Sequence, residues 1–432
     1  MSIFLSPSFN AHHFAAVMAS LLMLIVVILA IYGVRQLLFT VNRLTGVQRH
    51  PYIDIGIARW PLVEVLITAH NDTTMLARCI DSLLMTDYPL NQLKITICTD
   101  DSNSATEKTI ASYVRRFPEK ISSLQISPGL VEKSVALKAF WLCKKGDIAI
   151  MFDAKDVPGR WLLKQLVAPF FDPEIGAVMG RVVPVNSGAS LMGRLLDLER
   201  SANFQVGLQA HMNMNLLPQH EGTVSGVRLS AVMAVGGWHG DALAADADIN
   251  LRLMLNGWKT AYTNRAECYD VISQDWSERI KQGTRRVKEN SQLMTRYWRP
   301  LATSPHLTLG QRMNALLNLF SFVMPLVVLL GWGLVLGLYF FDTGFFLSKI
   351  LPIYVLMSFG VLGNFVAFFE MMMAVLLDGN RRRIRLLPFN LIGSSVNLLV
   401  HPVALCRLWL QSALSWTQGW RKTSHVKRSV SK

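Results

Sequence analysis

The sequence predicts an α/β domain inserted between membrane-spanning α-helices. Hydrophobic residues make up 51% of the 432 positions, a share that is high for a purely soluble protein. Apolar runs long enough to cross a bilayer as helices stand near both ends of the chain. Between them, over about residues 57–300, short apolar runs alternate with amphipathic stretches, a pattern typical of an α/β domain with a largely parallel sheet.

The first apolar run, residues 14–34, is uncharged and predicts a membrane-spanning helix. It is longer than the apolar core of a signal peptide, no basic residue precedes it, and no A-x-A cleavage site follows it. Arg35, Arg43 and Arg49 flank the run on its C-terminal side only. By the positive-inside rule, the N-terminus then faces outward and the domain that follows lies in the cytoplasm.

Two further apolar runs, residues 315–341 and 350–377, predict a transmembrane hairpin that ends on the cytoplasmic side at the basic cluster of residues 381–385. The last apolar stretch, residues 386–410, precedes a basic tail that a full crossing would leave outside. We therefore expect an interfacial or re-entrant segment, broken near Pro402 and followed by a cytoplasmic tail.

Three stretches of the middle region predict buried strands, at residues 63–68, 93–98 and 148–152. In doubly wound sheets, ligands bind outside the carboxyl ends of the strands, so the polar residues that follow these strands are expected to converge. Several carboxylates together suit a divalent cation on the diphosphate of a nucleotide, although acidic residues after strands also cap helices. The polar residues are His70, Asn71 and Asp72 after the first strand, Asp100, Asp101 and Ser102 after the second, and Asp153, Lys155 and Asp156 after the third.

The formal net charge of +14 does not indicate nucleic-acid binding. The basic residues cluster beside apolar segments and form neither a free arm nor a stripe between stacking aromatic residues, so a bilayer is the expected partner. The five cysteines are isolated and form no C-x-x-C pair. This usage is typical of a reducing compartment and argues against a disulfide framework or a zinc site.

Several motifs occur in an order that resembles a known family. Residues 153–158 are D-A-K-D-V-P, similar to a D-A-E/D-D-x-P form of the DxD motif. Residues 236–258 contain G-G-W, A-A-D-A-D-I, R-L and G-W, similar to G-G-W…T-E-D-x-D-L…R-L…G-[YW]. Residues 282–286 are Q-G-T-R-R where Q-x-x-R-W is expected, and residues 420–425 resemble a W-x-K-T-x-H tail. In order and spacing, the chain resembles the membrane-bound processive branch of glycosyltransferase family 2, which includes cellulose, hyaluronan and poly-N-acetylglucosamine synthases.

The resemblance implies a GT-A domain at residues 51–305, a transmembrane helix and basic flank before it at 1–50, a transmembrane hairpin at 306–385, and an interfacial or re-entrant segment with a basic tail at 386–432. It implies inverting transfer from a nucleotide sugar, with UDP as the expected nucleotide, to a growing polysaccharide or a lipid-linked acceptor. The expected location is the bacterial inner membrane. With about three spans, export of a polymer would need a partner protein or a homo-oligomer.

The resemblance also implies roles for particular residues. Asp246 would be the catalytic base, because an ionised carboxylate within hydrogen-bond reach can take the proton of an acceptor hydroxyl. Gln282 and Arg285 would complete the catalytic set along the acceptor and the diphosphate, where a guanidinium pairs with phosphate oxygens. Asp153 and Asp156 would bind Mg²⁺ or Mn²⁺. The donor-binding residues would be His70, Asp100, Lys133, Asp153, Lys155 and Arg286.

Four positions depart from the family pattern. The family pattern has an acidic residue where this chain has Lys155, and a glutamate where it has Ala245. It commonly has an arginine where this chain has Gly283, and it has a tryptophan where this chain has Arg286. A lysine beside Asp153 lowers the negative charge available to a metal ion, and loss of the indole removes an apolar face for a sugar. The chain is then either an active enzyme with an adjusted site, which we favour, or a catalytically degenerate homologue that serves as a membrane scaffold or nucleotide-sugar-sensing subunit of a polysaccharide assembly.

Overall fold

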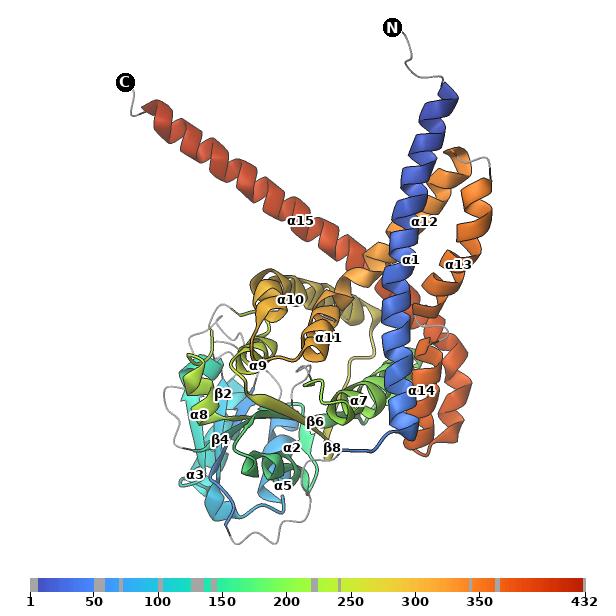
Figure 1. Ribbon diagram of the computed structural model, residues 1–432. Coiled ribbons are helices and arrows are strands. Elements are labelled where there is room, and N and C mark those ends of the chain that lie inside the picture. Colours follow the sequence, from blue (N-terminus) through green and yellow to red (C-terminus); the bar gives the residue numbers. More distant parts are fainter. Residues whose placement is uncertain are drawn as a thin grey trace.

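The computed structural model describes residues 7–49, 59–69, 73–99, 104–125, 136–140, 146–218, 224–239, 242–341, 344–361 and 366–429. Within these residues, an α/β part is built on one eight-stranded sheet, and long helices project from one side of it (Figure 1). The strand order is β3-β2-β1-β4-β7-β6-β8-β5.

The strands in one half of the sheet are all parallel. β1 (Val63–Thr68) lies between β2 (Leu93–Thr99) and β4 (Ile148–Asp153), and β3 (Ile121–Gln125) forms the edge beside β2. The three predicted strands are therefore confirmed. β7 runs antiparallel to β4 and β6, whereas β6 and β8 are parallel to each other, so the whole sheet is mixed. The remaining strands are β5 (Val157–Pro158), β6 (Ile175–Pro184), β7 (Ser225–Arg228) and β8 (Lys259–Asp270).

Helices cover both faces of this sheet, and β1 packs apolar side chains against each. Val65 and Ile67 of β1 pack in a core cluster with α2 and α5, whereas Leu66 points to the opposite face and packs in a cluster with α8 and α9. The helices of the α/β part are α2 (Thr73–Leu84), α3 (Ser104–Arg116), α5 (Leu162–Val167), α8 (Leu229–Ala234) and α9 (Ala245–Leu255), with short turns η1 (Leu90–Gln92), η2 (Ala168–Phe171) and η3 (Ser187–Ala189).

One continuous helical stretch connects the sheet to the long helices. It consists of α6 (Leu191–Ala202), the π-helix η4 (Asn203–Leu208) and α7 (Gln209–Asn213). α6 packs against α14, and η4 and α7 pack against α1 (Pro7–Thr45). α1 has 39 residues, a length of about 58 Å, so it is about twice as long as the ~30 Å that a spanning helix needs.

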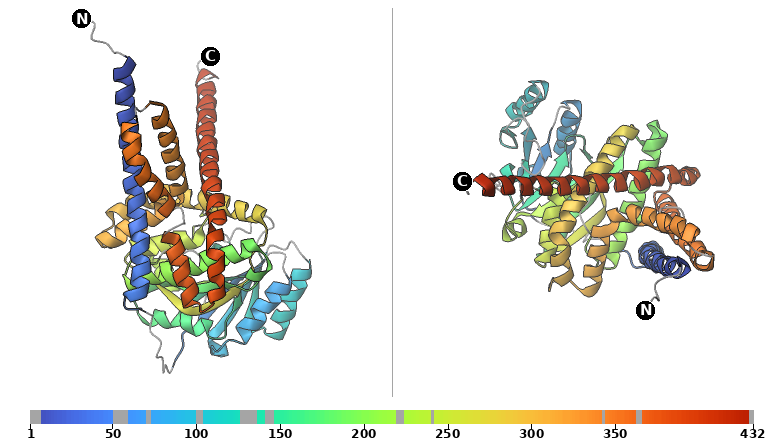
Figure 2. Two further views of the ribbon diagram at one scale, coloured as in Figure 1. Left: turned by 90° about the vertical axis from the view of Figure 1, so that its right-hand side faces the viewer. Right: turned by 90° about the horizontal axis from the view of Figure 1, so that it is seen from above.

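The rest of the chain is helical. It contains α10 (Trp276–Thr303), α11 (Leu309–Phe320), η5 (Ser321–Val323), α12 (Met324–Phe341), α13 (Phe345–Val361), α14 (Val366–Leu377), η6 (Arg381–Phe389) and α15 (Asn390–Ser429). α10 lies over the α/β part beside α9, whereas α12 and α13 stand beside the N-terminal half of α1 (Figure 1). Figure 2 shows α1, α12, α13 and α15 rising on the same side of the sheet.

Three helical stretches of the described chain are long and apolar enough to cross a membrane: His13–Thr45, Leu309–Phe340 and Arg381–Gln411. The first two agree with predicted spans. The predicted third span, residues 350–377, is instead divided between α13 and α14, with residues 362–365 outside the described chain.

The predicted break near Pro402 is wrong, because α15 continues through this residue. A proline inside a helix removes one hydrogen bond and crowds the preceding turn. Packing just after the proline supports the helix, since Ala404 and Leu405 are buried against Val287 of α10 and Phe322 of η5.

Candidate active site

The register of the sheet brings the ends of the three predicted strands side by side. Thr68 at the end of β1 pairs with Asp153 at the end of β4 on one side and with Cys98 of β2 on the other. The Thr68 hydroxyl also donates a hydrogen bond of 3.1 Å to the Asp153 carboxylate. The segments that continue from β1 and β2 carry His70 and Asp100, which lie outside the described residues, as does Lys133.

Asp156 holds the turn after β4 through two hydrogen bonds with the backbone of Asp153. Its Oδ2 accepts a hydrogen bond of 2.8 Å from the backbone N–H of Asp153, and its own N–H donates to the Asp153 carbonyl at 2.9 Å. Asp156 is fully buried, and Oδ1 has no hydrogen-bonding partner among the described residues. Burial, with the Asp153 carboxylate as the next cause, raises the pKa of Asp156 to about 7. Asp153 and Lys155 are half-buried on the other side of this turn.

A second buried carboxylate, Asp270, lies next to this turn at the end of β8. The strand that follows the turn, β5, pairs with this end of β8. Arg200 of α6 places Nη1 2.8 Å from Asp270 Oδ2, so the arginine compensates a buried negative charge close to the turn. Sequence reasoning had no account of Arg200, because nothing in the local pattern links α6 to the end of β8.

Asp246 lies in the first turn of α9 and is half-buried. The positive end of the helix dipole favours an ionised carboxylate in this position. The preceding residue, Ala245, is buried in an apolar cluster with Trp238 and Ile249. A glutamate at residue 245 would carry its charge into this cluster, so the departure at this position fits the packing.

The start of α9 is fixed by Asp248, whose buried carboxylate is a centre of polar contacts. Oδ2 lies 3.0 Å from Arg252 Nη2 and 3.1 Å from His239 Nδ1. Oδ1 accepts a hydrogen bond of 2.5 Å from the hydroxyl of Tyr297 and lies 3.3 Å from Arg296 Nη1, both on α10. Asp248 therefore ties α9 to α10 and to the loop before α9, and so holds the turn that carries Asp246.

The residues predicted on α10 lie nearer the N-terminal end of that helix than Arg296 and Tyr297, which contact α9. Gln282, Arg285 and Arg286 are exposed, and Arg285 pairs with Glu289 at 2.8 Å. Gln282 is about 21 Å along the helix axis from Arg296, which contacts the start of α9. No hydrogen bond or ion pair between described residues joins Gln282 or Arg285 to Asp246, and a shared catalytic role of the three residues stays a prediction.

Gly283 lies where α10 and α15 approach each other closely. A Cβ at this position would stand 3.2 Å from Cγ1 of Val400 on α15. Val400 would have to shift by a few tenths of an ångström to admit a methyl group at this position. The missing arginine of the motif therefore coincides with a helix crossing.

The described residues offer a limited set of metal ligands. Within this part of the chain, no three His, Cys, Asp or Glu side chains are grouped so that they could hold a metal ion. Asp153 presents a half-buried carboxylate at a strand end, whereas Asp156 lies under the turn and uses one oxygen to hold it. Carboxylate oxygens suit Mg²⁺ and Mn²⁺, so Asp153 fits such an ion provided that further ligands come from elsewhere.

A sequence model of the family described as glycosyltransferase like family 2 matches residues 61–289. The chain is 23% identical over 265 residues to the probable glycosyltransferase YdaM of Bacillus subtilis, covering 58% of this chain and 62% of that protein. It is 25% identical over 277 residues to beta-monoglucosyldiacylglycerol synthase of Synechocystis sp., covering 63% of this chain and 55% of that protein. The chain thus spans less than two thirds of the length of both relatives.

Among solved structures, the mannosyltransferase PcManGT from Pyrobaculum calidifontis, in complex with GDP-Man and Mn²⁺, has a similar fold. The match has a TM-score of 0.56 and 14% sequence identity, and it covers 88% of this chain and 99% of that chain. The predicted architecture is confirmed at the level of the fold: a GT-A-like α/β part with a mixed sheet, flanked by helices apolar enough to span a membrane.

Proposed function

This chain belongs to glycosyltransferase like family 2, and we propose that it transfers a sugar from a nucleotide donor, with inversion, to an acceptor at the inner membrane. One observation carries the proposal. The region that matches the family holds Asp153 at the carboxyl end of β4 and Asp246 in the first turn of α9, and a buried carboxylate fixes each position from behind. Two fixed carboxylates at one domain supply the metal and base groups that such a transfer needs.

We propose that the donor diphosphate binds at the turn after β4. Asp153 would hold Mg²⁺ or Mn²⁺, which offsets the negative charge on the leaving diphosphate. Lys155 would add a second positive charge there, and Asp156 would position the turn rather than serve as an exposed ligand. The bound GDP-Man and Mn²⁺ of PcManGT support the nucleotide sugar and the ion. His70, Asp100, Lys133 and Arg286 remain proposed donor contacts.

We propose that Asp246 is the catalytic base. The positive end of the α9 dipole favours a charged carboxylate at this position, and Asp248 holds the same turn through its contacts with α10. The carboxylate would take the proton of the acceptor hydroxyl as its oxygen attacks the anomeric carbon. Gln282 and Arg285 stay proposed acceptor-side residues, since they are exposed on α10 on the way to the membrane helices.

The acceptor we propose is a growing polysaccharide or a lipid-linked sugar, as in the processive branch that the motifs resemble. The name of the Synechocystis relative supports a lipid acceptor. Three helical stretches of the described chain are apolar enough to span a bilayer, which supports an acceptor at the membrane. Export of a polymer would require a homo-oligomer or a separate partner protein.

The experiment is release of nucleoside diphosphate from a panel of UDP-sugars and GDP-sugars by the full-length protein in detergent. The panel is run with Mg²⁺, with Mn²⁺ and with a chelator, and with membrane extract as a source of acceptor. Asp153→Asn should lose the metal-dependent rate, whereas Glu107→Gln, an exposed acid on α3, serves as the matched control. Nucleotide binding without release on every donor would contradict an active enzyme and favour the degenerate scaffold.

A further inference from the structure

One cavity is lined by none of the residues assigned to the reaction. It has a volume of about 860 Å³ and lies between the ends of β6 and β8, the start of α6 and the segment from α14 to η6. Among its lining residues arginines outnumber carboxylates, with Arg181, Arg194, Arg382, Arg383 and Arg385 against Asp197, Glu267 and Asp378.

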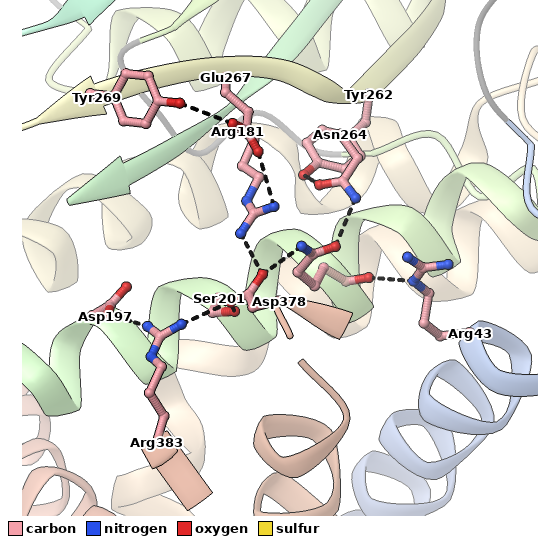
Figure 3. A network of polar contacts seen from close by, with 11 residues as sticks. Arg43, Arg181, Asp197, Ser201, Tyr262, Asn264, Glu267, Tyr269, Asp378 and Arg383 are labelled. Carbon is pink, nitrogen blue, oxygen red and sulfur yellow. Dashed lines mark hydrogen bonds and ion pairs between the residues drawn. The ribbon is translucent and has the colours of Figure 1, made fainter. Parts of the chain in front are cut away.

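The inner wall of this cavity is a rigid polar network around Asp378, at the end of α14 (Figure 3). Oδ1 of Asp378 accepts hydrogen bonds from Arg181 Nη2 at 2.6 Å and Gln205 Nε2 at 2.7 Å. Oδ2 accepts from the Ser201 hydroxyl at 2.6 Å and from Arg383 Nη1 at 2.9 Å. These contacts fix the segment between α14 and η6 to β6 and α6.

The charges of the cavity are not balanced. Arg181 also lies 3.4 Å from Glu267, and Arg383 also pairs with Asp197, so these two arginines account for all three carboxylates of the lining. The other three arginines have exposed side chains and no ion pair with any described residue. Arg194 donates one hydrogen bond to the carbonyl of Gly188. The rim of the cavity therefore presents positive charge in excess of its own acids.

Exposed apolar side chains lie on the same segments as these arginines. Leu377 of α14, which lines the cavity, is 39% exposed, and Phe389 at the end of η6 and Leu391 and Ile392 at the start of α15 are 48%, 45% and 44% exposed. The C-terminal half of α1 packs against α14 and carries exposed leucines and valines nearly to its end. Exposed apolar groups beside unpaired arginines are typical of the interface between headgroups and acyl chains of a bilayer.

We propose that this cavity binds a phosphate group, and that the phosphate belongs to the headgroup of an anionic phospholipid. Guanidinium groups pair with phosphate oxygens through parallel N–H bonds, and Arg382 and Arg385 hold these donors at the open side of the cavity. The apolar residues around η6 would contact the acyl chains. Because Asp378 and Arg383 join this segment to α6, a bound lipid would also hold the α/β part against the membrane.

The test measures how much phosphatidylglycerol, relative to phosphatidylcholine, the full-length protein retains after purification from mixed bilayers, by mass spectrometry of the bound lipid. Arg382→Gln and Arg385→Gln should each lower this preference about fivefold, the usual effect of one arginine near an anionic surface. Arg381→Gln is the matched control, because Arg381 is an exposed arginine of the same segment that does not line the cavity. The control should keep the wild-type preference.

Two results would overturn the proposal. An equal loss in Arg381→Gln would show attraction to the basic segment as a whole rather than to the cavity. A second experiment adds inorganic phosphate to delipidated protein and measures the apparent melting temperature. Stabilisation by phosphate that depends on Arg382 and Arg385, without any lipid preference, would assign the cavity to a free anion and contradict a lipid headgroup.

Discussion

At the scale of single residues, Lys155 has the most direct effect on the proposed donor site. It stands in the turn between Asp153, the proposed ion ligand, and Asp156, which holds the turn. We predict that Lys155→Asp lowers the concentration of Mn²⁺ needed for half-maximal turnover by several-fold, because the change replaces a positive charge near the ion by a negative one. A metal titration of the rate measures this. An unchanged midpoint would mean that the lysine ammonium points away from the ion.

His211 makes the stability of the protein depend on pH. Its ring is buried between α7, α1 and α11, where Nδ1 lies 2.8 Å from the Gly207 carbonyl and Nε2 lies 3.3 Å from the amide of Asn318. Burial, followed by the nearby Arg35, lowers the pKa of His211 to about 4. The neutral ring, with its proton on Nδ1, fits both contacts.

The sign of this effect follows from linkage. Above pH 6.5 the ring is neutral in both the folded and unfolded states, and between pH 6.5 and about 4 only the unfolded state takes up the proton. The free energy of unfolding should therefore fall as the pH is lowered through this window. We predict a smaller fall in His211→Gln, measured as the apparent melting temperature at pH 7.5 and pH 5. Equal falls in both proteins would show that another group is responsible.

The sequence identified the residues of the turn after β4 but did not show how deeply each side chain is buried. The motif spacing singled out Asp153 and Asp156 alike, whereas the structure places one half-buried at the strand end and the other fully buried beneath it. Burial depends on what α2, β8 and α6 pack against the turn, and these elements come from distant parts of the chain. The contact of Arg200 with Asp270 was missed for the same reason.

At the scale of elements, α15 packs closely against the rest of the protein at a glycine, Gly393. A Cβ on Gly393 would stand 2.8 Å from Oε1 of Glu199, which is itself held by Arg279 of α10 at 2.7 and 2.9 Å. Because Arg279 restrains this carboxylate, the side chain cannot move aside without loss of an ion pair. The contact joins α6, α10 and α15 at one point.

We predict that Gly393→Ala destabilises the protein by about 1–3 kcal/mol, the usual cost of an overpacked contact. Thermal unfolding in detergent measures this. Gly333→Ala on α12 is the matched control, because a Cβ there meets no atom within 4 Å. It should be neutral or slightly stabilising, since alanine favours a helix over glycine. Similar melting temperatures for the two variants would contradict the seating of α15 at Gly393.

The junction of α9 and α10 leads to a second prediction at this scale. Asp248→Ala leaves Arg252 and Arg296 without their shared carboxylate, and we expect a loss of about 3–5 kcal/mol of stability together with a lower turnover. Asp275→Ala, at the exposed start of α10 where the side chain makes no capping bond, should have little effect. A stable Asp248→Ala protein with wild-type turnover would show that Asp248 does not position Asp246.

The elements were predicted where local pattern dominates. β1, β2 and β4 are short, mainly apolar runs followed by polar residues, and they were located to within one residue. The helices after residue 345 were not located as closely, because apolar composition alone does not distinguish a membrane-spanning helix from one that packs on the domain. α14 packs against α6, and α15 is supported through Pro402 by contacts with α10 and η5. Both depend on tertiary packing.

At the scale of the whole molecule, the orientation in the membrane remains a prediction from charge. α15 diverges from α1, α12 and α13, and seen from above it runs across the α/β part (Figures 1 and 2). The C-terminal end of α15 rises to about the level of the N-terminal end of α1 in these views, so a basic end on the side of the domain requires α15 to turn down toward the membrane surface from this course. A crossing would carry that end to the opposite side, against the charge rule.

Cysteine labelling tests this orientation in a protein that lacks the exposed Cys406. We predict that an impermeant maleimide labels Asn10→Cys, at the start of α1, in intact cells. Ser429→Cys, at the end of α15, should be labelled only in inverted membrane vesicles. Labelling of Ser429→Cys from outside would mean that α15 crosses the bilayer.

The central claim is that Asp246 acts as the base of a glycosyl transfer, and its most direct test separates donor binding from turnover in Asp246→Asn. The donor with the highest rate is used for both measurements, with nucleotide affinity from calorimetry and kcat from nucleotide release. We predict an unchanged affinity and a kcat lower by about 10²–10⁴-fold, the range that general base catalysis contributes. A variant that binds the donor and turns it over at the wild-type rate would show that Asp246 is not the base.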